Sequence, residues 1–242
     1  MRQILASVLV NSIYEMKNYP VVLVNTVLSP LSILLLITFV SRGSLIGVGI
    51  EGGFIMSMFQ SGMSLQGDLS HLKNDFKIQD MVVSSPTSPA AYVFGMSLAE
   101  IIYSIPALAV LVVLAAIYIH PNAAEALGML VVLLLMFLAS IMLGYTLSTF
   151  SSDIVQSFAF SRLISTLFST IPPVYYPITY IPLPFRYVAY LSPTTYAAEL
   201  TQNMTGFLQL PGIDLTYAWI VLIVVTAALS YIGLRKARWR EV

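Results

Sequence analysis

Two charged residues of opposite sign occur inside apolar stretches of this chain, and they are the first candidates for chemistry. Glu100 precedes the run IIYSIPALAVLVVLAAIY, and Arg162 lies within IVQSFAFSRLISTLFST. A charge at the centre of a bilayer costs roughly 2.5–3.5 kcal/mol on insertion scales, so it normally faces protein or water. Both residues lie about ten positions into a stretch entered from the same side, or ~15 Å deep in a helix. The sequence therefore predicts a Glu100–Arg162 ion pair, either a gate on a transport path or a bridge that only fixes helix packing.

Other patterns that carry catalysis or cofactor binding are absent from the sequence. None of the four lysines follows a glycine, so there is no phosphate-binding loop of the Walker A type. The two histidines, His71 and His120, fit no metal-ligand or nucleophile pattern. The chain has no cysteine, which excludes disulfides and thiol chemistry. We expect no catalytic, cofactor-binding or metal-binding residue here, and no enzyme activity.

The composition indicates that these residues belong to an all-α, polytopic membrane protein with a single transmembrane domain over 1–242. Hydrophobic residues make up 58% of the 242 positions and charged residues only 9%, against about 25% charged in a typical soluble domain. A helical span needs about 20 mostly apolar residues. Six stretches meet this requirement, although the second contains Glu51 and several glycines. The six predicted spans are residues 21–40, 45–65, 89–119, 126–150, 154–171 and 215–234.

The distribution of lysine and arginine predicts the orientation of the spans. Basic residues favour the cytoplasmic side, and with six spans both termini lie on one side. Eight basic residues fall on the side of the termini and two, Arg42 and Arg186, on the other, with Arg162 inside the fifth span. We therefore expect a multi-pass protein of the plasma membrane with both termini in the cytoplasm and residues 172–214 outside. The eight are Arg2, Lys17, Lys73, Lys77, Arg235, Lys236, Arg238 and Arg240.

Two segments on the cytoplasmic side have a helical period. Residues 1–19 place apolar side chains near one face, which predicts an amphipathic helix lying in the membrane interface. Between spans two and three, residues 67–88 form the most charged internal stretch, in which Leu69, Leu72 and Phe76 share one helical face beside Asp75 and Lys77. A short helix with such a stripe can dock into a groove on a soluble partner. The alternative is an ordinary cytoplasmic loop.

The segment before the last span is rich in proline and tyrosine. PPVYYPITYIPLPFRYVAYLSP, residues 172–193, contains six of the 13 prolines and five of the 14 tyrosines. Proline excludes one continuous helix, although Pro184 and Pro193 can each begin a short one. Tyrosine places its ring in lipid and its hydroxyl group near the headgroups. The segment is either a series of short helices or an extracellular loop with an aromatic belt.

Together these features resemble permeases of type-2 ATP-binding-cassette exporters, such as daunorubicin-resistance-like drug-efflux and polysaccharide-export permeases. The resemblance covers nearly the whole chain. It rests on an amphipathic helix before six spans, on DFKIQDMVVSSPTSPAAYVFG, on Glu100, and on PPVYYPITYIPLPFRYVAYLSPTTYAAEL. Ser192 stands where the family commonly has asparagine, and Thr194 where a hydrophobic residue is common. The resemblance implies short re-entrant helices between spans five and six. It makes an outer gate of Pro173, Tyr176, Pro177, Pro182, Pro193 and Tyr196.

The resemblance also implies the partners and the activity. The permease would form a homodimer, or a heterodimer with a similar permease, and would bind two separate ATPase subunits that hold ATP and magnesium. The helix at about 68–78 would couple ATP hydrolysis to export of a hydrophobic or amphipathic molecule, drug-like or lipid. No cofactor in this chain and no nucleic-acid partner are expected. A lipid-linked polysaccharide is the alternative cargo, and an ATP-independent secondary transporter or scramblase is the alternative class.

Overall fold

The computed structural model describes residues 9–18, 20–74, 89–151 and 153–236, and within these ranges the chain is helical with no strand. The predicted all-α fold class is therefore confirmed. All six stretches predicted as spans are helical. The elements are η1 (Leu9–Tyr14, a π-helix), α2 (Glu15–Asn18), α3 (Pro20–Val40), α4 (Ile46–Asn74), α6 (Pro89–Tyr118), α7 (Ala123–Phe150), α8 (Ile154–Thr170), η2 (Ile178–Tyr180, a 3-10 helix), α9 (Arg186–Ala189), α10 (Pro193–Met204) and α11 (Gly212–Lys236).

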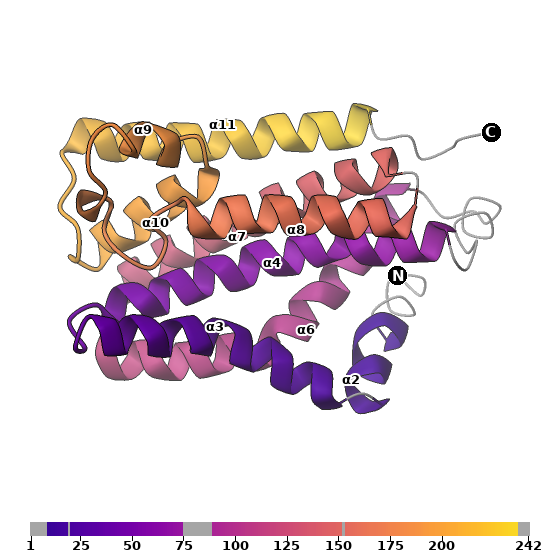
Figure 1. Cartoon of the computed structure of the whole chain (residues 1–242), viewed down its shortest axis with the longest axis horizontal. Helices are drawn as coiled ribbons and strands as arrows, with labels where there is room; N and C mark the ends of the chain where they lie inside the picture. Colours follow the sequence, from indigo (N-terminus) through magenta and orange to yellow (C-terminus); the bar gives the residue numbers. More distant parts are fainter. Residues whose placement is uncertain (1–8, 19, 75–88, 152, 237–242) are drawn as a thin grey trace.

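The six long helices run side by side and alternate in direction along the chain (Figure 1). The short helix α2 and the C-terminal end of α11 lie at one end of the bundle. The short elements η2, α9 and α10 lie at the other end (Figure 1). We call these the α2 end and the α10 end. The two groups of short elements therefore flank opposite ends of one helical bundle, as the predicted topology requires.

Local sequence explains where several helices begin. The Asn122 side chain accepts hydrogen bonds from the amides of Ala124 and Glu125, and the Glu125 carboxylate accepts one from the Asn122 amide at 2.9 Å, which is a capping box before α7. Asp153 caps α8 by accepting from the Gln156 amide at 2.7 Å. Helices α3, α6 and α10 all begin with proline. Proline suits this position because an amide hydrogen in the first turn would have no partner within the helix.

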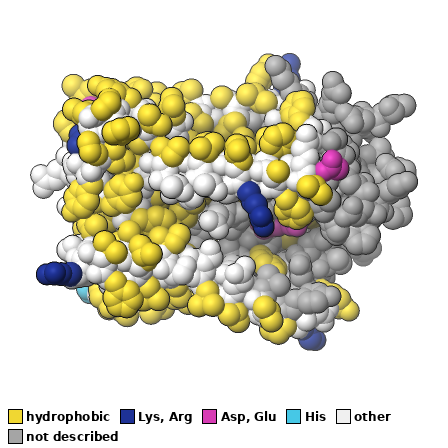
Figure 2. All heavy atoms as spheres, in the orientation of Figure 1, with side chains coloured by type: hydrophobic (Ala, Val, Ile, Leu, Met, Phe, Trp, Pro, Cys, Tyr) yellow, Lys and Arg dark blue, Asp and Glu magenta, His cyan; other side chains and the backbone are white. Residues whose placement is uncertain are grey.

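Three of the described helices are long and apolar enough to cross a membrane by themselves: Phe94–Tyr118, Ala123–Phe150 and Gly212–Arg235. A shorter apolar stretch, Val24–Val40, lies in α3. Many large apolar side chains on these helices are exposed, such as Leu127, Leu130 and Leu134 on α7. Figure 2 shows hydrophobic side chains spread over the face in view. Water would not stabilise such a surface, whereas lipid would.

Helix α4 occupies the centre of the bundle and packs against α3, α6, α7, α8 and α10. Its crossing with α7 is close: a side chain on Gly62 would collide with Ser140, whose hydroxyl group donates to the Met58 carbonyl oxygen at 3.3 Å. Because neighbouring helices surround it, α4 carries polar residues that a lipid-facing helix could not. This explains why α4 falls outside the three strongly apolar helices.

The structure corrects the predicted boundary between the second span and the cytoplasmic helix. We predicted that the span ends near residue 65 and that a separate helix covers 68–78, but α4 continues without a break to Asn74. Gly67 does not end the helix, because the ring of Phe158 on α8 packs against it. Residues 67–74 are therefore part of α4, and residues 75–88 lie outside the described part of the chain.

The N-terminal segment is helical where it is described. Residues 9–14 form the π-helix η1, followed by one α-helical turn, α2, and then by Pro20 at the start of α3. Residues 1–8 lie outside the described ranges. The position of this segment at a membrane surface stays a prediction.

Candidate substrate cavity and outer segment

A cavity of about 330 Å³ lies between α3, α4 and α6. Twelve of its 16 lining residues are polar, although α3 and α6 are among the most apolar helices of the chain. The lining residues are Asn25, Thr26, Ser29, Pro30, Ile33, Met56, Ser57, Gln60, Ser61, Ser64, Asp68, Glu100, Tyr103, Ser104, Ala107 and Tyr175. A hollow of this size and polarity inside a membrane bundle can admit a molecule, or the polar part of one.

Each of the three helices contributes one face to the cavity. On α4 the polar positions 57, 60, 61, 64 and 68 follow the three-to-four-residue spacing of a single helical face. Helix α6 contributes positions 100, 103, 104 and 107 with the same spacing. Apart from Glu100, these residues were not predicted from the sequence, although the repeat of serine, glutamine and aspartate along α4 was a visible signal. Without knowing that α3 and α6 lie beside that face, the repeat does not define a cavity.

Glu100 faces this cavity and not Arg162. Its carboxylate accepts a hydrogen bond from the Ser64 hydroxyl group on α4. Arg162 is exposed on α8, and no ion pair joins it to Glu100 in the structure as described. The predicted pair is therefore corrected. Helix α4 lies between α6 and α8, so equal depth in the membrane did not make these two side chains neighbours.

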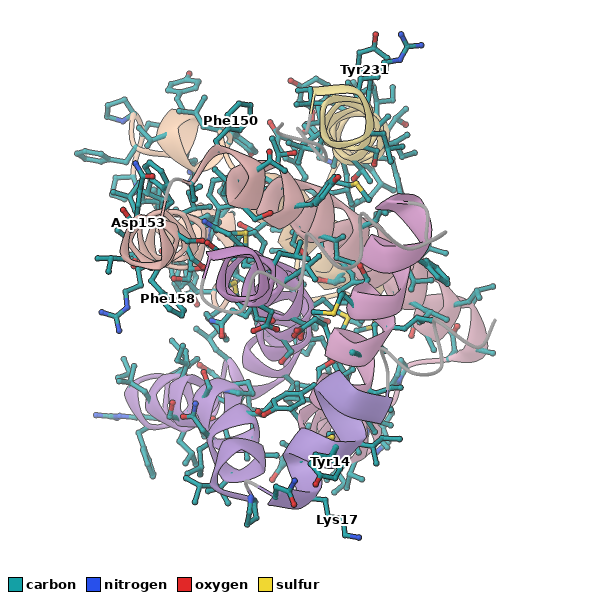
Figure 3. All side chains as sticks on the ribbon, turned by 90° about the vertical axis from the view of Figure 1, so that its right-hand side faces the viewer. Tyr14, Lys17, Phe150, Asp153, Phe158 and Tyr231 are labelled. Atoms are coloured by element: carbon teal, nitrogen blue, oxygen red, sulfur yellow. The ribbon has the colours of Figure 1, made fainter. Side chains whose placement is uncertain are left out.

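The residues predicted to contact an ATPase fall into two groups. Leu69 is 8% exposed and belongs to a buried cluster with Met96, Phe137 and Tyr145, so its side chain already packs inside this chain. Leu72 lies on the last turn of α4, and Asp75, Phe76 and Lys77 lie outside the described residues. Figure 3 views the bundle from the α2 end, where Tyr14, Lys17, Asp153 and Phe158 are labelled. The last turn of α4, which precedes residues 75–88, lies at this end (Figure 1).

The segment between α8 and α11, residues 171–211, packs onto the α10-end half of α4. A side chain on Gly52 would come within 2.6 Å of the Val174 carbonyl oxygen, so only glycine admits this backbone. Val174 and Tyr175 are buried, and Tyr175 also lines the cavity. We call residues 171–211 the outer segment. It therefore contributes a wall to the cavity and lies against the central helix.

Of the predicted gate residues, most are buried in the outer segment. Pro173, Pro177 and Pro193 are buried, as is Tyr196, whereas Tyr176 is half-buried and Pro182 is exposed. Pro193 begins α10 as predicted, and α9 begins two residues after Pro184. Whether these short helices re-enter a membrane is untested and stays a prediction.

Tyrosine side chains hold the outer segment together. The Tyr190 hydroxyl group donates to a Glu199 carboxylate oxygen at 2.9 Å, and the Tyr196 hydroxyl group donates to the Tyr190 carbonyl oxygen at 2.9 Å. The Arg186 guanidinium group donates to the carbonyl oxygens of Ile181 and Thr179 at 2.7 and 2.9 Å. Burial raises the pKa of Glu199 to about 6 and that of Tyr196 to about 12. These bonds explain a fixed shape without a continuous helix.

Comparison with known protein families identifies the class of protein. A family model described as ABC-2 type transporter matches residues 3–205, and the chain therefore belongs to the ABC-2 type transporter family. No curated protein matches the chain. The family assignment makes the chain a multi-pass membrane permease, the transmembrane component of an ABC transporter that works with ABC ATPase subunits and is not itself the ATPase. The predicted resemblance to ABC-2 permeases is confirmed.

Proposed function

We propose that this chain is the permease subunit of an ATP-driven exporter that moves an amphipathic molecule, drug-like or lipid, out of the cytoplasm or the inner leaflet. The observation that carries the proposal is the cavity between α3, α4 and α6, whose lining residues are mostly polar, in a bundle with many exposed apolar side chains. Hydroxyl, amide and carboxylate groups on the wall suit a polar head, and Ile33, Met56 and Tyr175 suit an apolar part.

The orientation of the bundle supports export from the cytoplasmic side. Lys17 and Arg235 lie in elements at the α2 end, whereas Arg42 follows α3 and Arg186 begins α9, both at the α10 end (Figure 1). With basic residues inside, the α2 end is cytoplasmic and six helices span the plasma membrane. Tyr175 then contributes to the outer wall of a cavity reached from the cytoplasmic half.

The energy comes from separate subunits. The sequence has no Walker A motif, so ATP and magnesium bind to two ATPase subunits on the cytoplasmic face. The last turn of α4 with Leu72, and the segment that follows it with Asp75, Phe76 and Lys77, would contact them. A second copy of this chain, or a similar permease, completes the transporter, and substrate passes between the two permeases.

A second candidate cargo is a lipid-linked polysaccharide. Asn25, Gln60 and the serines of the α4 face can exchange hydrogen bonds with sugar hydroxyl groups, and Tyr103 and Tyr175 can stack on sugar rings. This candidate uses the same cavity and the same ATPases. The two cargoes are therefore distinguished by which transport probe, an amphipathic molecule or a lipid-linked oligosaccharide, is moved across the membrane.

Transport in proteoliposomes tests the proposal. The permease is reconstituted with its ATPase, and a fluorescent phospholipid, a cationic amphipathic dye and a lipid-linked oligosaccharide serve as probes. We expect ATP-dependent movement of an amphipathic probe, at least about tenfold slower in Ser61→Leu, which fills the cavity. Ser32→Leu is the matched control, because Ser32 is exposed on α3 and does not line the cavity. Movement without ATP, or equal rates in both variants, would contradict the proposal.

A further inference from the structure

The α10-end half of α4 holds a buried carboxyl group that takes no part in the cavity. Glu51 is 0% exposed, and one of its carboxylate oxygens accepts a hydrogen bond from the Thr205 hydroxyl group. Its other oxygen, Oε2, has no hydrogen-bond partner among the described residues. No lysine, arginine or histidine in the described ranges forms an ion pair with it. A buried carboxylate without such compensation is strongly unfavourable.

A second buried side chain, on α10, is equally unmatched. Gln202 is 1% exposed, and neither its amide oxygen nor its amide nitrogen has a hydrogen-bond partner in the described structure. Gln202 precedes Thr205 by three positions, so the two lie on adjacent turns of one face. The Thr205 hydroxyl group also approaches the carbonyl oxygens of Thr201 and Gln202 at 3.1 and 3.5 Å. Thr205 therefore joins Glu51 to the turn of α10 that carries Gln202.

Two contacts fix the backbone on either side of Glu51. A side chain on Gly47 would collide with the ring of Phe207, and Gly52 lies against the Val174 carbonyl oxygen. The outer segment therefore contacts α4 both before and after Glu51. A group bound to Glu51 would lie where the outer segment meets the central helix.

The chemistry of this cluster selects the kind of ligand. Carboxylate, hydroxyl and amide oxygens are ligands for hard cations. The cluster offers one negative charge, which a monovalent cation neutralises and a divalent cation would exceed. A proton would also neutralise Glu51, and the resulting hydroxyl group could donate to the Gln202 amide oxygen, but the Gln202 amide nitrogen would stay unmatched.

We propose that Glu51, Gln202 and Thr205 form a binding site for a small alkali cation that fastens the outer segment to α4. The cation contacts the free oxygen of Glu51 and the amide oxygen of Gln202. The Gln202 amide nitrogen donates to a water bound to the cation. Occupancy favours the arrangement in which the outer segment is docked on α4.

Thermal unfolding of the full-length permease in lipid nanodiscs tests the site. The midpoint is measured in sodium, potassium and choline chloride at equal ionic strength. A ligand that binds only the folded state raises the midpoint with concentration, and we expect a saturable rise of about 3 °C or more in an alkali salt over choline. The salt with the lower half-saturating concentration identifies the preferred cation.

Variants tie the effect to these residues. Glu51→Gln should abolish the dependence on alkali salt, and Gln202→Leu should raise the half-saturating concentration about tenfold. The matched control is Glu199→Gln. Glu199 is a buried carboxyl group on α10, the helix of Gln202, and it already has the Tyr190 hydroxyl group as its partner. This variant should keep the full response. If Glu51→Gln does not fold, the site is tested instead by Thr205→Val and by the unfolding midpoints of the wild type in the three salts. Equal midpoints in all three salts, a response to pH alone, or an unchanged response in Glu51→Gln would overturn the site.

Discussion

The side chain of Gln66 on α4 donates a hydrogen bond to the carbonyl oxygen of Ser157 on α8, with 2.9 Å between nitrogen and oxygen. Both residues are fully buried, and the Ser157 hydroxyl group lies 3.3 Å from the same nitrogen. The bond fixes α8 on one side of α4. On another side α4 meets α6 through Ser64 and Glu100. Charges on α6 and α8 are therefore separated by the central helix.

This separation predicts that Glu100 and Arg162 act independently. Breaking a buried ion pair typically costs about 3–5 kcal/mol and makes single substitutions worse than the double one. We expect instead that Glu100→Gln and Arg162→Gln have additive effects on the free energy of unfolding, within ~0.5 kcal/mol. Arg162→Gln alone should not carry the cost of a broken pair, because no ion pair joins Arg162 to Glu100 among the described residues. If the double variant were more stable than either single variant, the result would contradict this account and support the Glu100–Arg162 ion pair.

The outer segment should respond to pH through Glu199. Burial raises its pKa from 4.5 to about 6, the Tyr190 hydrogen bond lowers it, and Asp214 raises it. The folded state therefore binds this proton more tightly than the unfolded state. The stabilisation is fully present below about pH 4.5 and is lost as pH rises through 6.

Glu199→Gln should remove this dependence. The glutamine keeps an oxygen for the Tyr190 hydroxyl group but cannot ionise. We expect it to match the wild type near pH 4.5 and to be more stable by about 2 kcal/mol at pH 8, since one pKa unit corresponds to about 1.4 kcal/mol. Tyr190→Phe should enlarge the loss above pH 6, because the carboxylate loses its donor. Parallel unfolding midpoints of Glu199→Gln and wild type across pH 4.5–8 would show that Glu199 does not titrate in this way.

The end of α4 should separate folding from ATPase binding. Leu69 is packed in the core, so Leu69→Ala should destabilise the permease itself by about 2–5 kcal/mol. Phe76→Ala should leave its unfolding midpoint unchanged but reduce co-purification of the ATPase, because binding energy concentrates in a few apolar anchors. Lys77→Ala, a rim charge, should do much less. The measurements are the unfolding midpoint and the yield of ATPase in a pull-down. Full ATPase recovery with Phe76→Ala would reduce the segment to a plain connector.

The helices could be predicted from the sequence because apolar length, proline and caps are local signals. Pro89 and Pro193 begin helices as expected, and Asn122 with Glu125 explains why α7 begins a few residues before the predicted position 126. The neighbours of each helix could not be predicted in the same way. Depth along a span placed Glu100 level with Arg162, but it carries no information about the helix that lies between them.

The buried Glu51 illustrates the same limit. Gly47, Gly49, Gly52 and Gly53 surround it in the sequence, and such glycines are compatible with close packing or with a flexible helix end. The structure shows close packing, because Val174 and Phe207 fill the space that side chains at 52 and 47 would need. Those partners lie more than a hundred residues away, which is why a local pattern could not name them.

The most direct measurement of the central claim, that the polar cavity lies on an ATP-driven path, is the accessibility of Ser61 in each state of the transporter. Because the chain has no cysteine, Ser61→Cys introduces a single thiol into the cavity wall. Ala116→Cys is the control, since Ala116 is exposed on α6 and does not line the cavity. In inside-out vesicles that contain the permease and its ATPase, a water-soluble thiol reagent should label Ser61→Cys and not Ala116→Cys. Trapping with ATP and vanadate should slow that labelling at least about tenfold. Labelling of Ser61→Cys that is absent, or that is the same with and without trapped ATP, would contradict the account.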